Sequence, residues 1–317
     1  MESSPTSMPL VTAVVVNFNG TDLTCDCVDS LLSSSYPNLE IAIVDNASAD
    51  QPAALFREKY PDCQVIESSE NRGYTGGVNL RLEHAFEGGS KFALVLNNDT
   101  ICEPDMVEVL VRAAIRNPKA GMLSPRILYH EPRDLVWYAG GAYSLFFGVS
   151  RHWRLRKRDR PDTRGQREVS FISGCAFLIR REVPDQLGLL DEKLFHIAED
   201  ADLSIRASRA GYRLLYIPEA RLYHRESVAT LKHFGSRVQI YLATRNILYL
   251  QRKHGRWYHH LIFYPWFSAR WLVYQSLKHL FRGEPVMVGA LFEAVVSSLR
   301  GETGPPLDFI KRHSPDN

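Results

Sequence analysis

Several acidic residues follow apolar runs in this chain and could carry chemistry, and the first is Asp99. The segment Asn97-Asn98-Asp99 comes directly after the apolar run 92–96. A charged side chain at the end of a buried strand costs free energy unless something there uses it. A single carboxylate in such a place can bind Mg²⁺ or Mn²⁺, whose other ligands are often substrate phosphates. Asp99 is a candidate metal ligand, because it lies too far before the expected helix 103–118 to cap it.

A second acidic cluster contains Glu199, Asp200 and Asp202. Neighbouring carboxylates raise one another's pKa, which is unfavourable without a use. The alternative is that these acids stabilise the N-terminus of a helix expected over 200–211, where the helix dipole is positive. That explains one or two acids better than three after an apolar stretch. Glu199 and Asp200 are therefore candidates for proton transfer.

Asp45, the glycine turn 70–79 and His224 are further candidates. Asp45 could accept hydrogen bonds from a ribose hydroxyl or a base N–H, since Asp50 is the expected cap of the following helix. The turn reads ENRGYTGGVN, and its glycines permit positive φ and close backbone approach to a phosphate. It matches neither GxGxxG nor GxxxxGK[ST]. A lone histidine is more often structural, so His224 gains weight only beside a metal site.

Strands and helices that alternate along the first 120 residues must position these side chains. Apolar, β-branched runs predict buried strands, and amphipathic stretches between them predict helices, the first of them capped by Asp22. This alternation predicts a parallel α/β sheet covered on both faces, which binds ligands beyond the carboxyl ends of its strands. Three strands end in polar residues that should face one crevice: Asn17 and Asn19, Asp45 and Asn46, and 97–99.

The pattern loosens after residue 120, where 134–144 and 167–181 look like strands of a mixed sheet. The basic segment 150–168 between them is expected to be a mobile loop. It could be simply solvated, or it could handle a phosphate or an acceptor.

The composition of the chain excludes some functions and favours others. The net charge of +2 argues against nucleic-acid binding, and five irregularly spaced cysteines suggest reduced thiols. The chain shows no secretory signal and no transmembrane run, so a cytoplasmic location is expected. Residues 227–283 contain no Asp or Glu but nine Lys or Arg and twelve aromatics. This segment suits either contact with a membrane surface or packing on the core, whereas Pro265 and Arg270 argue against a full span.

Six motifs, taken together and in order, resemble the family 2 glycosyltransferases with the GT-A fold, over roughly residues 10–250. They are VVVNFNG, IVDNASAD, ENRGYTGGVN, LVLNNDT, SGCAFLIRR and LLDEKLFHIAEDADLSIRASRAGYRLLYIPEARLYH. The nearest subgroup resembles rhamnosyltransferase-like enzymes of bacterial surface-polysaccharide assembly. The resemblance implies a mostly parallel, mixed, doubly covered sheet in a catalytic domain at 1–226, and a helical extension at 227–317.

The resemblance also implies roles for particular residues. Asp99 would hold Mn²⁺ or Mg²⁺ with His224, and Asn97 stands where the family has a first acid. Asp200 would be the general base, with Glu199 in reserve, and the transfer would invert the anomeric centre. SGCAF (173–177) would line the acceptor side. The residues on the side of a dTDP- or UDP-linked sugar donor would be Asn17, Asp45, Asn71, Gly73, Gly77, Asn79 and Asn98, the last of which shapes a turn.

Departures from the family pattern limit the expected reaction. The QxxRW motif of processive members is missing, and 239–250 reads differently near its place. Addition of one or a few sugars is therefore expected, to a glycan or polyprenyl-linked acceptor at the inner face of the plasma membrane. A sugar nucleotidyltransferase is an alternative, although NFNGTDLT lacks its glycine-rich, basic phosphate loop. A catalytically silent nucleotide-sugar-binding protein is another. The sequence leaves the donor sugar, the linkage and the oligomeric state open.

Overall fold

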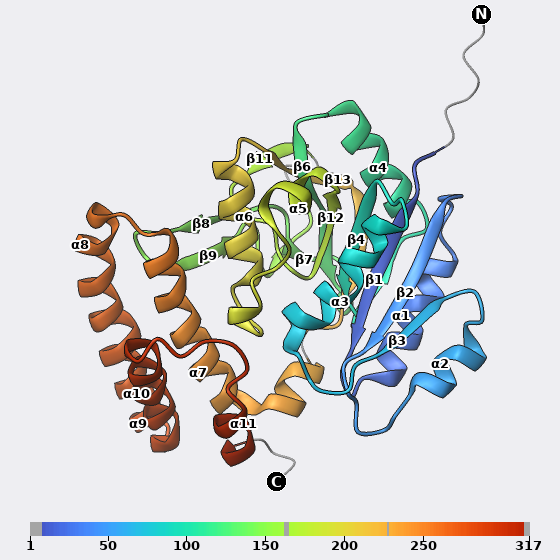
Figure 1. Ribbon diagram of the computed structural model, residues 1–317. Coiled ribbons are helices and arrows are strands. Elements are labelled where there is room, and N and C mark those ends of the chain that lie inside the picture. The colour runs from blue at the N-terminus through green and yellow to red at the C-terminus, as the bar shows by residue number, and fades with distance from the viewer. Residues whose placement is uncertain (1–7, 162–164, 227, 314–317) are drawn as a thin grey trace, which may run out of the picture.

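The computed structural model describes residues 8–161, 165–226 and 228–313, with the side chains of 228–234 left out of that description. An eleven-stranded mixed sheet forms its centre (Figure 1). Its first four long strands run parallel in the order β3, β2, β1, β4. They are β1 (Val11–Asn17), β2 (Leu39–Asp45), β3 (Gln64–Glu67) and β4 (Phe92–Asn97). The predicted parallel sheet is confirmed, and β1 is buried along its whole length.

Helices cover both faces of this parallel part. They are α1 (Thr21–Leu32), α2 (Ala53–Lys59), α3 (Gly73–Glu87) and α4 (Met106–Arg116). The strand order reverses direction after β3, so right-handed crossovers put α3 on the opposite face from α1. Gly20 and Pro52 occupy the N-cap positions of α1 and α2, so the caps predicted at Asp22 and Asp50 are wrong. Asp50 instead accepts a hydrogen bond from the Thr21 hydroxyl at 2.6 Å.

The second half of the sheet is mixed, as predicted. It contains β12 (Ala176–Arg180), which runs antiparallel to β4, and β13 (Arg213–His224), which runs parallel to β6 (Ala120–Tyr129) and antiparallel to β5 (Thr100–Cys102). The strand β7 (Leu135–Tyr138) also belongs to this sheet, whereas β8 (Gly141–Ser144) belongs to a separate two-stranded sheet. The helices of this half are α5 (Glu182–Leu187), η2 (Glu192–Leu194) and α6 (Glu199–Arg209).

The basic segment 150–168 differs from the loop expected there. Its described residues contribute to β9 (Val149–His152), β10 (Lys157–Arg158) and β11 (Arg167–Val169). A largely buried ion pair, 3.1 Å between Arg126 Nη1 and Asp159 Oδ2, ties the segment to β6. Residues 162–164 lie outside the described residues. Periodicity could not reveal these strands because each contributes only two to four residues.

Helices form the C-terminal part of the molecule, as predicted. They are α7 (Val228–His254, kinked at Gly235), α8 (Trp257–Trp266), the π-helix η3 (Phe267–Val273), α9 (Tyr274–Phe281), α10 (Pro285–Leu299) and α11 (Leu307–His313). No helix in the described part of the chain combines the length and apolar character needed to cross a bilayer. Phe195, from the loop before α6, joins Tyr241, Leu242 and Phe309 in a buried cluster. The domain boundary at 226/227 stays a prediction.

Candidate active site

The polar ends of β1 and β2 form a shared hydrogen-bonded group. The two strands pair in register with Asn17 opposite Asp45, so their last side chains must meet. Asn17 Nδ2 donates to Asp45 Oδ1 at 3.2 Å and to Ser48 Oγ at 2.9 Å, and its Oδ1 accepts from Thr24 Oγ1 at 2.7 Å. Both Asn17 and Asp45 are buried. The sequence predicted that both residues face one crevice, and in the structure they are in direct contact.

The glycine turn before α3 lies beside this group. Asn46 Nδ2 donates to Asn71 Oδ1 at 3.1 Å and to the Gly73 carbonyl at 3.0 Å, while Asn71 Oδ1 accepts from the Gly73 N–H at 2.9 Å. Gly73 has φ +71°, and a Cβ there would lie 2.3 Å from the Phe195 carbonyl oxygen. A Cβ on Gly77 would lie 2.8 Å from Val16 Cγ1. Both glycines are therefore required by close packing, and Asn46 organises the turn.

Asn79 and Asn98, also predicted on the donor side, hold elements of the protein together. Asn79 exchanges two hydrogen bonds with the backbone of Leu190, at 2.9 and 3.1 Å. Asn98 Nδ2 donates to Thr24 Oγ1 at 3.0 Å, next to the start of α1. These contacts use Nδ2 and Oδ1 of Asn79 and Nδ2 of Asn98. Their predicted contacts with a donor stay predictions.

Asp99 and His224 meet at the ends of β4 and β13. Both are buried, and 3.1 Å separates Asp99 Oδ1 from His224 Nε2. Burial lowers the pKa of His224, but Cys175 and Asp99 together raise it well above its ordinary value, which makes this approach an ion-pair contact. Trp137 packs edge-on against the ring, with centroids 4.6 Å apart. The pairing follows from the register of β5 and β13, which sets His224 opposite Thr100.

This pair fits a divalent cation in part. Two ligands at right angles on one Mg²⁺ lie about 3 Å apart, since each bond is roughly 2.1 Å long. The described residues contain no group of three or more His, Cys, Asp or Glu side chains arranged to hold an ion. A cation held here would need oxygen ligands from elsewhere, and substrate phosphates commonly supply them.

Glu199 and Asp200 begin α6, after a loop whose last residue, Ala198, has a left-handed backbone. Asp200 Oδ2 accepts from the Gly174 N–H at 2.9 Å, and its Oδ1 accepts from the Ala201 N–H at 2.7 Å. Burial raises the pKa of Asp200 to about 6. Burial and the charge of Asp200 raise the pKa of Glu199 to about 8. At neutral pH Asp200 is therefore ionised and Glu199 is protonated, which separates a base from an acid.

Residues 174–175 connect the acid pair to the metal-binding candidates. The Cys175 carbonyl accepts a hydrogen bond from the Asn97 N–H at 2.9 Å, while Gly174 donates to Asp200. Burial raises the pKa of Cys175, His224 lowers it, and the charges of Asp99 and Asp200 add to the increase. Cys175 therefore lies close enough to both Asp99 and Asp200 for their charges to act on it. Tyr74 completes the link to the glycine turn, because its hydroxyl donates to the Gly174 carbonyl at 2.8 Å.

Known proteins are similar to this chain over much of its length. The chain is 27% identical over 236 residues to N-acetylglucosaminyl-diphospho-decaprenol L-rhamnosyltransferase of Mycobacterium tuberculosis, covering 69% of this chain and 77% of that one. It is 28% identical over 230 residues to O-antigen biosynthesis protein RfbC of Myxococcus xanthus, covering 70% of this chain and 18% of that longer protein.

The fold is that of GT-A glycosyltransferases. The mannosyltransferase PcManGT of Pyrobaculum calidifontis, solved with GDP-Man and Mn²⁺, superposes with a TM-score of 0.55 at 19% identity and covers 93% of this chain and 88% of its own. The sequence profile described as "Glycosyltransferase like family 2" matches residues 9–259. The chain therefore belongs to the family 2 glycosyltransferases.

Proposed function

We propose that this protein transfers a sugar from a dTDP- or UDP-linked donor to a hydroxyl of a polyprenyl-linked glycan, with inversion and with a divalent metal. The reaction class follows from the family. The acceptor is inferred from the relative that acts on a diphospho-decaprenol acceptor. A role in surface-polysaccharide assembly is supported by the name of the O-antigen relative. The observation that carries the proposal is Asp200, a carboxylate fixed by two backbone N–H groups beside the buried Glu199, with burial raising the pKa of both acids.

The chemistry is a single displacement at the anomeric carbon. The acceptor oxygen forms a bond to C1 while the bond from C1 to the diphosphate oxygen breaks, and the electron pair leaves with the nucleoside diphosphate. Asp200 takes the proton of the acceptor hydroxyl, a step that typically contributes about 10²–10⁴-fold. No covalent nucleophile is required. Glu199, being protonated, can donate a hydrogen bond to the sugar or the acceptor.

Asp99 and His224 are the residues that would hold the metal. A bound cation would stabilise the negative charge that gathers on the departing diphosphate. Asn17, Asp45 and Asn71 would receive the nucleotide at the ends of the parallel strands. The hydrogen bonds among Asn17, Asp45 and Ser48 already fix the direction of these side chains.

Release of nucleoside diphosphate tests the reaction. The protein would be incubated with a panel of NDP-sugars, with Mn²⁺, Mg²⁺ or EDTA, and with or without a lipid-linked acceptor. We expect metal-dependent release with one donor class, and at least about 100-fold less with Asp99→Ala. Asp105→Ala is the matched control, since this exposed acid lies before α4 and outside the site. Formation of an NDP-sugar from a sugar phosphate would favour the nucleotidyltransferase, and binding without turnover would favour a silent binding protein.

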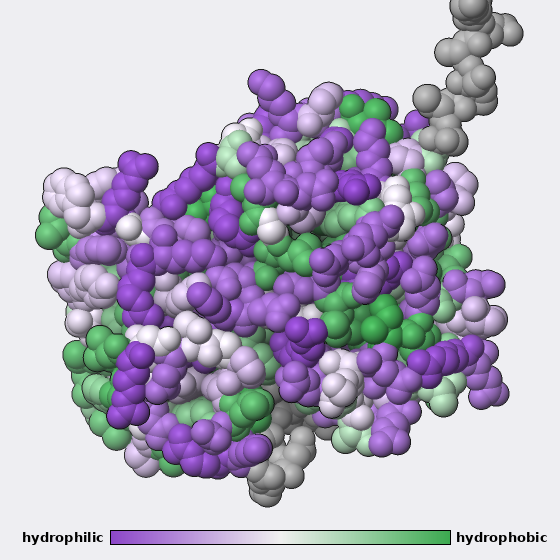
Figure 2. Space-filling view, viewed as in Figure 1, coloured by the Kyte–Doolittle hydropathy of each residue, from purple (hydrophilic) through white to green (hydrophobic). Residues whose placement is uncertain are grey.

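Contact with an anionic membrane surface is a second part of this proposal. The helices after residue 256 expose large apolar side chains, which Figure 2 shows as green and pale residues at the lower left. The most exposed are Trp257, Leu261, Val273, Leu280, Phe281 and Leu299. The described residues 235–283 contain Arg and Lys but no Asp or Glu. Apolar and basic side chains together favour the surface of an anionic bilayer, where a polyprenyl-linked acceptor lies.

Vesicle flotation tests this contact. We expect binding to vesicles that contain phosphatidylglycerol, weaker binding to phosphatidylcholine, and loss of binding in the triple variant Trp257→Ser, Leu261→Ser, Phe281→Ser. The control is Leu32→Ser with Ile115→Ser, which removes exposed apolar side chains from the catalytic part. Self-association of wild type that the triple variant abolishes, without any flotation, would assign the surface to a second copy instead.

A further inference from the structure

The loop before the acid pair adopts a backbone that must be held in place. Phe195, Ile197 and Ala198 have φ of +61°, +71° and +75°. Left-handed backbone is unfavourable for residues with a Cβ, most of all for a β-branched one such as Ile197. Each such residue costs roughly 1–3 kcal/mol and persists only where its surroundings fix it. Because Glu199 and Asp200 follow directly, whatever holds the loop also sets their direction.

Asn246, in the middle of α7, contacts this loop from the C-terminal side. Its Nδ2 lies 2.9, 2.8 and 2.8 Å from the carbonyl oxygens of Leu194, His196 and Ile197. The two N–H groups of one amide are thus shared among three acceptors. The carbonyls converge there because the left-handed residues turn them to one side. Asn246 is buried, so these carbonyls would lose this donor without gaining water if the amide were removed, although the Leu194 carbonyl would keep the His196 N–H.

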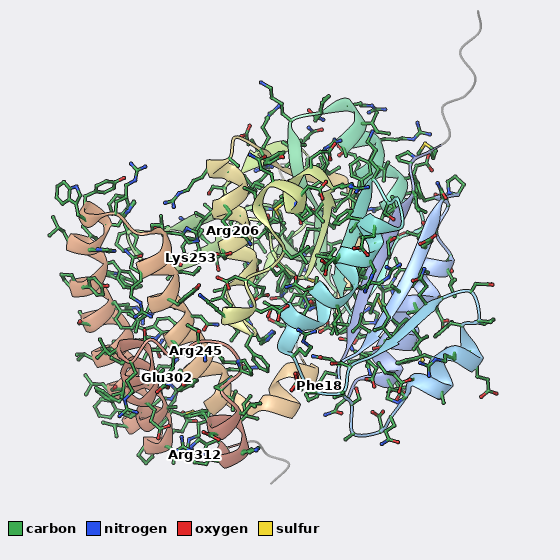
Figure 3. The ribbon with its side chains drawn as sticks, viewed as in Figure 1. Phe18, Arg206, Arg245, Lys253, Glu302 and Arg312 are labelled. Carbon is green, nitrogen blue, oxygen red and sulfur yellow. The ribbon has the colours of Figure 1, made fainter. Side chains whose placement is uncertain are left out.

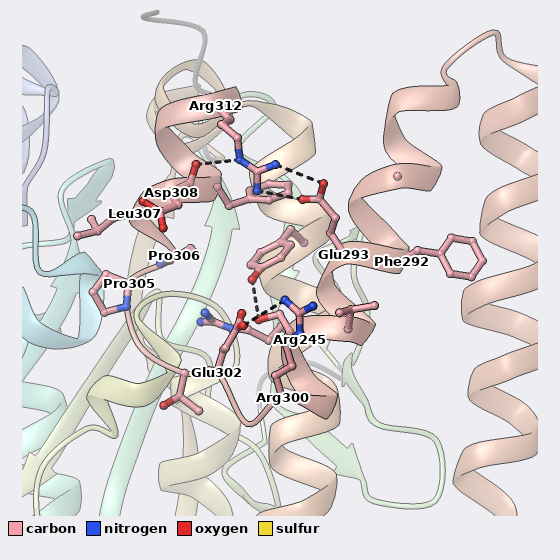
Figure 4. A pocket seen from close by; sticks show the side chains of 16 residues that line it. Arg245, Phe292, Glu293, Arg300, Glu302, Pro305, Pro306, Leu307, Asp308 and Arg312 are labelled. Carbon is pink, nitrogen blue, oxygen red and sulfur yellow. Dashed lines mark hydrogen bonds and ion pairs between the residues drawn. The ribbon is translucent and has the colours of Figure 1, made fainter.

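The orientation of this amide is fixed by Arg245. Arg245 Nε donates to Asn246 Oδ1 at 3.1 Å, which leaves Nδ2 to face the loop. Arg245 Nη1 donates to the Gly304 carbonyl at 2.8 Å, and the Gly304 N–H donates to the Lys193 carbonyl at 2.7 Å. Figure 4 shows Arg245 at the wall of a pocket of about 940 Å³ formed by α7, α10 and α11. The buried arginine therefore connects the C-terminal helices to both Asn246 and the loop.

The same helix, α7, also contacts the residues on both sides of this loop, Asp191 before it and Asp202 after it. Tyr249 Oη donates to Asp191 Oδ2 at 2.7 Å, and Lys253 Nζ lies 2.6 Å from Asp191 and 2.7 Å from Asp202. His254 Nε2 lies 2.7 Å from the fully buried Asp202. Figure 3 shows Lys253 on α7 facing Arg206 of α6, whose Nε contacts Asp202 at 2.7 Å. Residues 191 and 202 bracket the acid pair, so α7 holds the segment at three points.

The opposite side of the loop faces the turn predicted to bind the donor. The Phe195 carbonyl accepts hydrogen bonds from the Thr75 N–H at 3.2 Å and from Thr75 Oγ1 at 3.1 Å. The loop is therefore enclosed between α3 and α7. Movement on the α7 side would displace the acids, while the α3 side would keep its own contacts with Asn46 and Asn71.

We infer that Asn246 is a positioning residue for the proposed general base, acting through the carbonyls of residues 194, 196 and 197. The inference rests on the proposed transferase reaction for its kinetic consequence. The claim that Asn246 holds the loop rests on the three hydrogen bonds alone. Asn246 has no place among the residues predicted to touch the donor, the metal or the acceptor, so its loss should alter the placement of Asp200 without removing any binding group.

Asn246→Ala tests this inference through kinetics. A misplacement of about 1 Å can cost 10²-fold, so we expect kcat for sugar transfer to fall about 10- to 100-fold. The Kd for the nucleoside diphosphate, measured by calorimetry, should stay within about 3-fold, because the α3 side of the loop is retained. Arg252→Ala is the control on the same helix, since Arg252 contacts Ser298 of α10 instead of the loop. An equal loss of kcat in both variants would overturn the inference.

A second, milder pair of variants covers the case in which Asn246→Ala fails to fold. Tyr249→Phe removes the hydroxyl bonded to Asp191, and Tyr241→Phe removes an equivalent hydroxyl bonded to Ser297 of α10. Hydrogen exchange in 191–204 should quicken in Tyr249→Phe and in Asn246→Ala but not in Tyr241→Phe. Unchanged exchange in both would overturn the inference even if activity fell. If wild type released no nucleotide with any donor, the proposed function would fail, while the exchange measurement would still decide the role of α7.

Discussion

Asp45 and Asp200 are both carboxylates at element ends, yet their surroundings differ. Asp45 accepts hydrogen bonds from Asn17 and Ser48, in a group that strand register builds. Asp200 sits after a strained loop beside Glu199, and burial raises the pKa values of both acids. A carboxylate with satisfied partners is suited to binding a ligand in a fixed direction. A carboxylate that is desolvated near a second acid is suited to moving a proton.

The two regions are also held by different means. The proposed donor side, around Asn17 and Asp45, depends on neighbouring strands whose ends coincide because their backbones pair residue by residue. The acid pair depends on contacts from α3, α7 and the 174–175 segment, all distant along the chain. The donor side should therefore tolerate change in the C-terminal helices, and the acid pair should not.

Asp200→Asn should produce the largest effect. It removes the proposed base while keeping the size of the side chain, so transfer should fall at least about 10³-fold. The Kd for the nucleoside diphosphate should stay nearly unchanged, because the donor side lies elsewhere. Glu199→Gln is the matched control, and we expect a smaller loss because Glu199 is already protonated at neutral pH. A larger loss in Glu199→Gln, measured by product formation, would exchange the two roles.

Asp45→Ala should have a smaller effect, confined to the donor. Removal of this carboxylate leaves the buried Asn17 Nδ2 with one acceptor fewer, which costs about 1–3 kcal/mol and loosens the nucleotide contact. We expect KM for the NDP-sugar to rise about 10- to 100-fold with kcat little changed. Asp50→Ala is the control, since Asp50 follows in the same connection and accepts a hydrogen bond from the Thr21 hydroxyl. A fall in kcat without a rise in KM would place Asp45 outside the donor site.

The sequence predicted the grouping of Asn17 with Asp45 better than the contacts that hold the acid pair, for a physical reason. Apolar runs reveal buried strands, and parallel pairing then requires Asn17, Asp45 and Asp99 to lie at one edge. The partnership of Asn246 with the loop spans about fifty residues and depends on a left-handed backbone, which no local pattern encodes. The caps expected at Asp22 and Asp50 were wrong by two residues each. The helix α1 begins earlier, with Gly20 at its N-cap position, and α2 begins later, with Pro52 at its N-cap position.

The pH dependence should give the smallest effect and the finest comparison of the two carboxylates. Transfer needs ionised Asp200, so kcat/KM should fall about tenfold for each pH unit below about 6, the pKa to which burial raises this group. Stability should change in the opposite direction. The folded state binds the proton of Asp200 more tightly than the unfolded state, whose pKa is about 3.8. The contribution of this group to the free energy of unfolding should therefore rise, by about 1–3 kcal/mol, as the pH falls from about 6 to about 4. Denaturant titrations of wild type and Asp200→Asn at these two pH values isolate that contribution. An identical pH dependence in the two proteins would show that Asp200 titrates near its ordinary value, and the base would then have to be sought in another group.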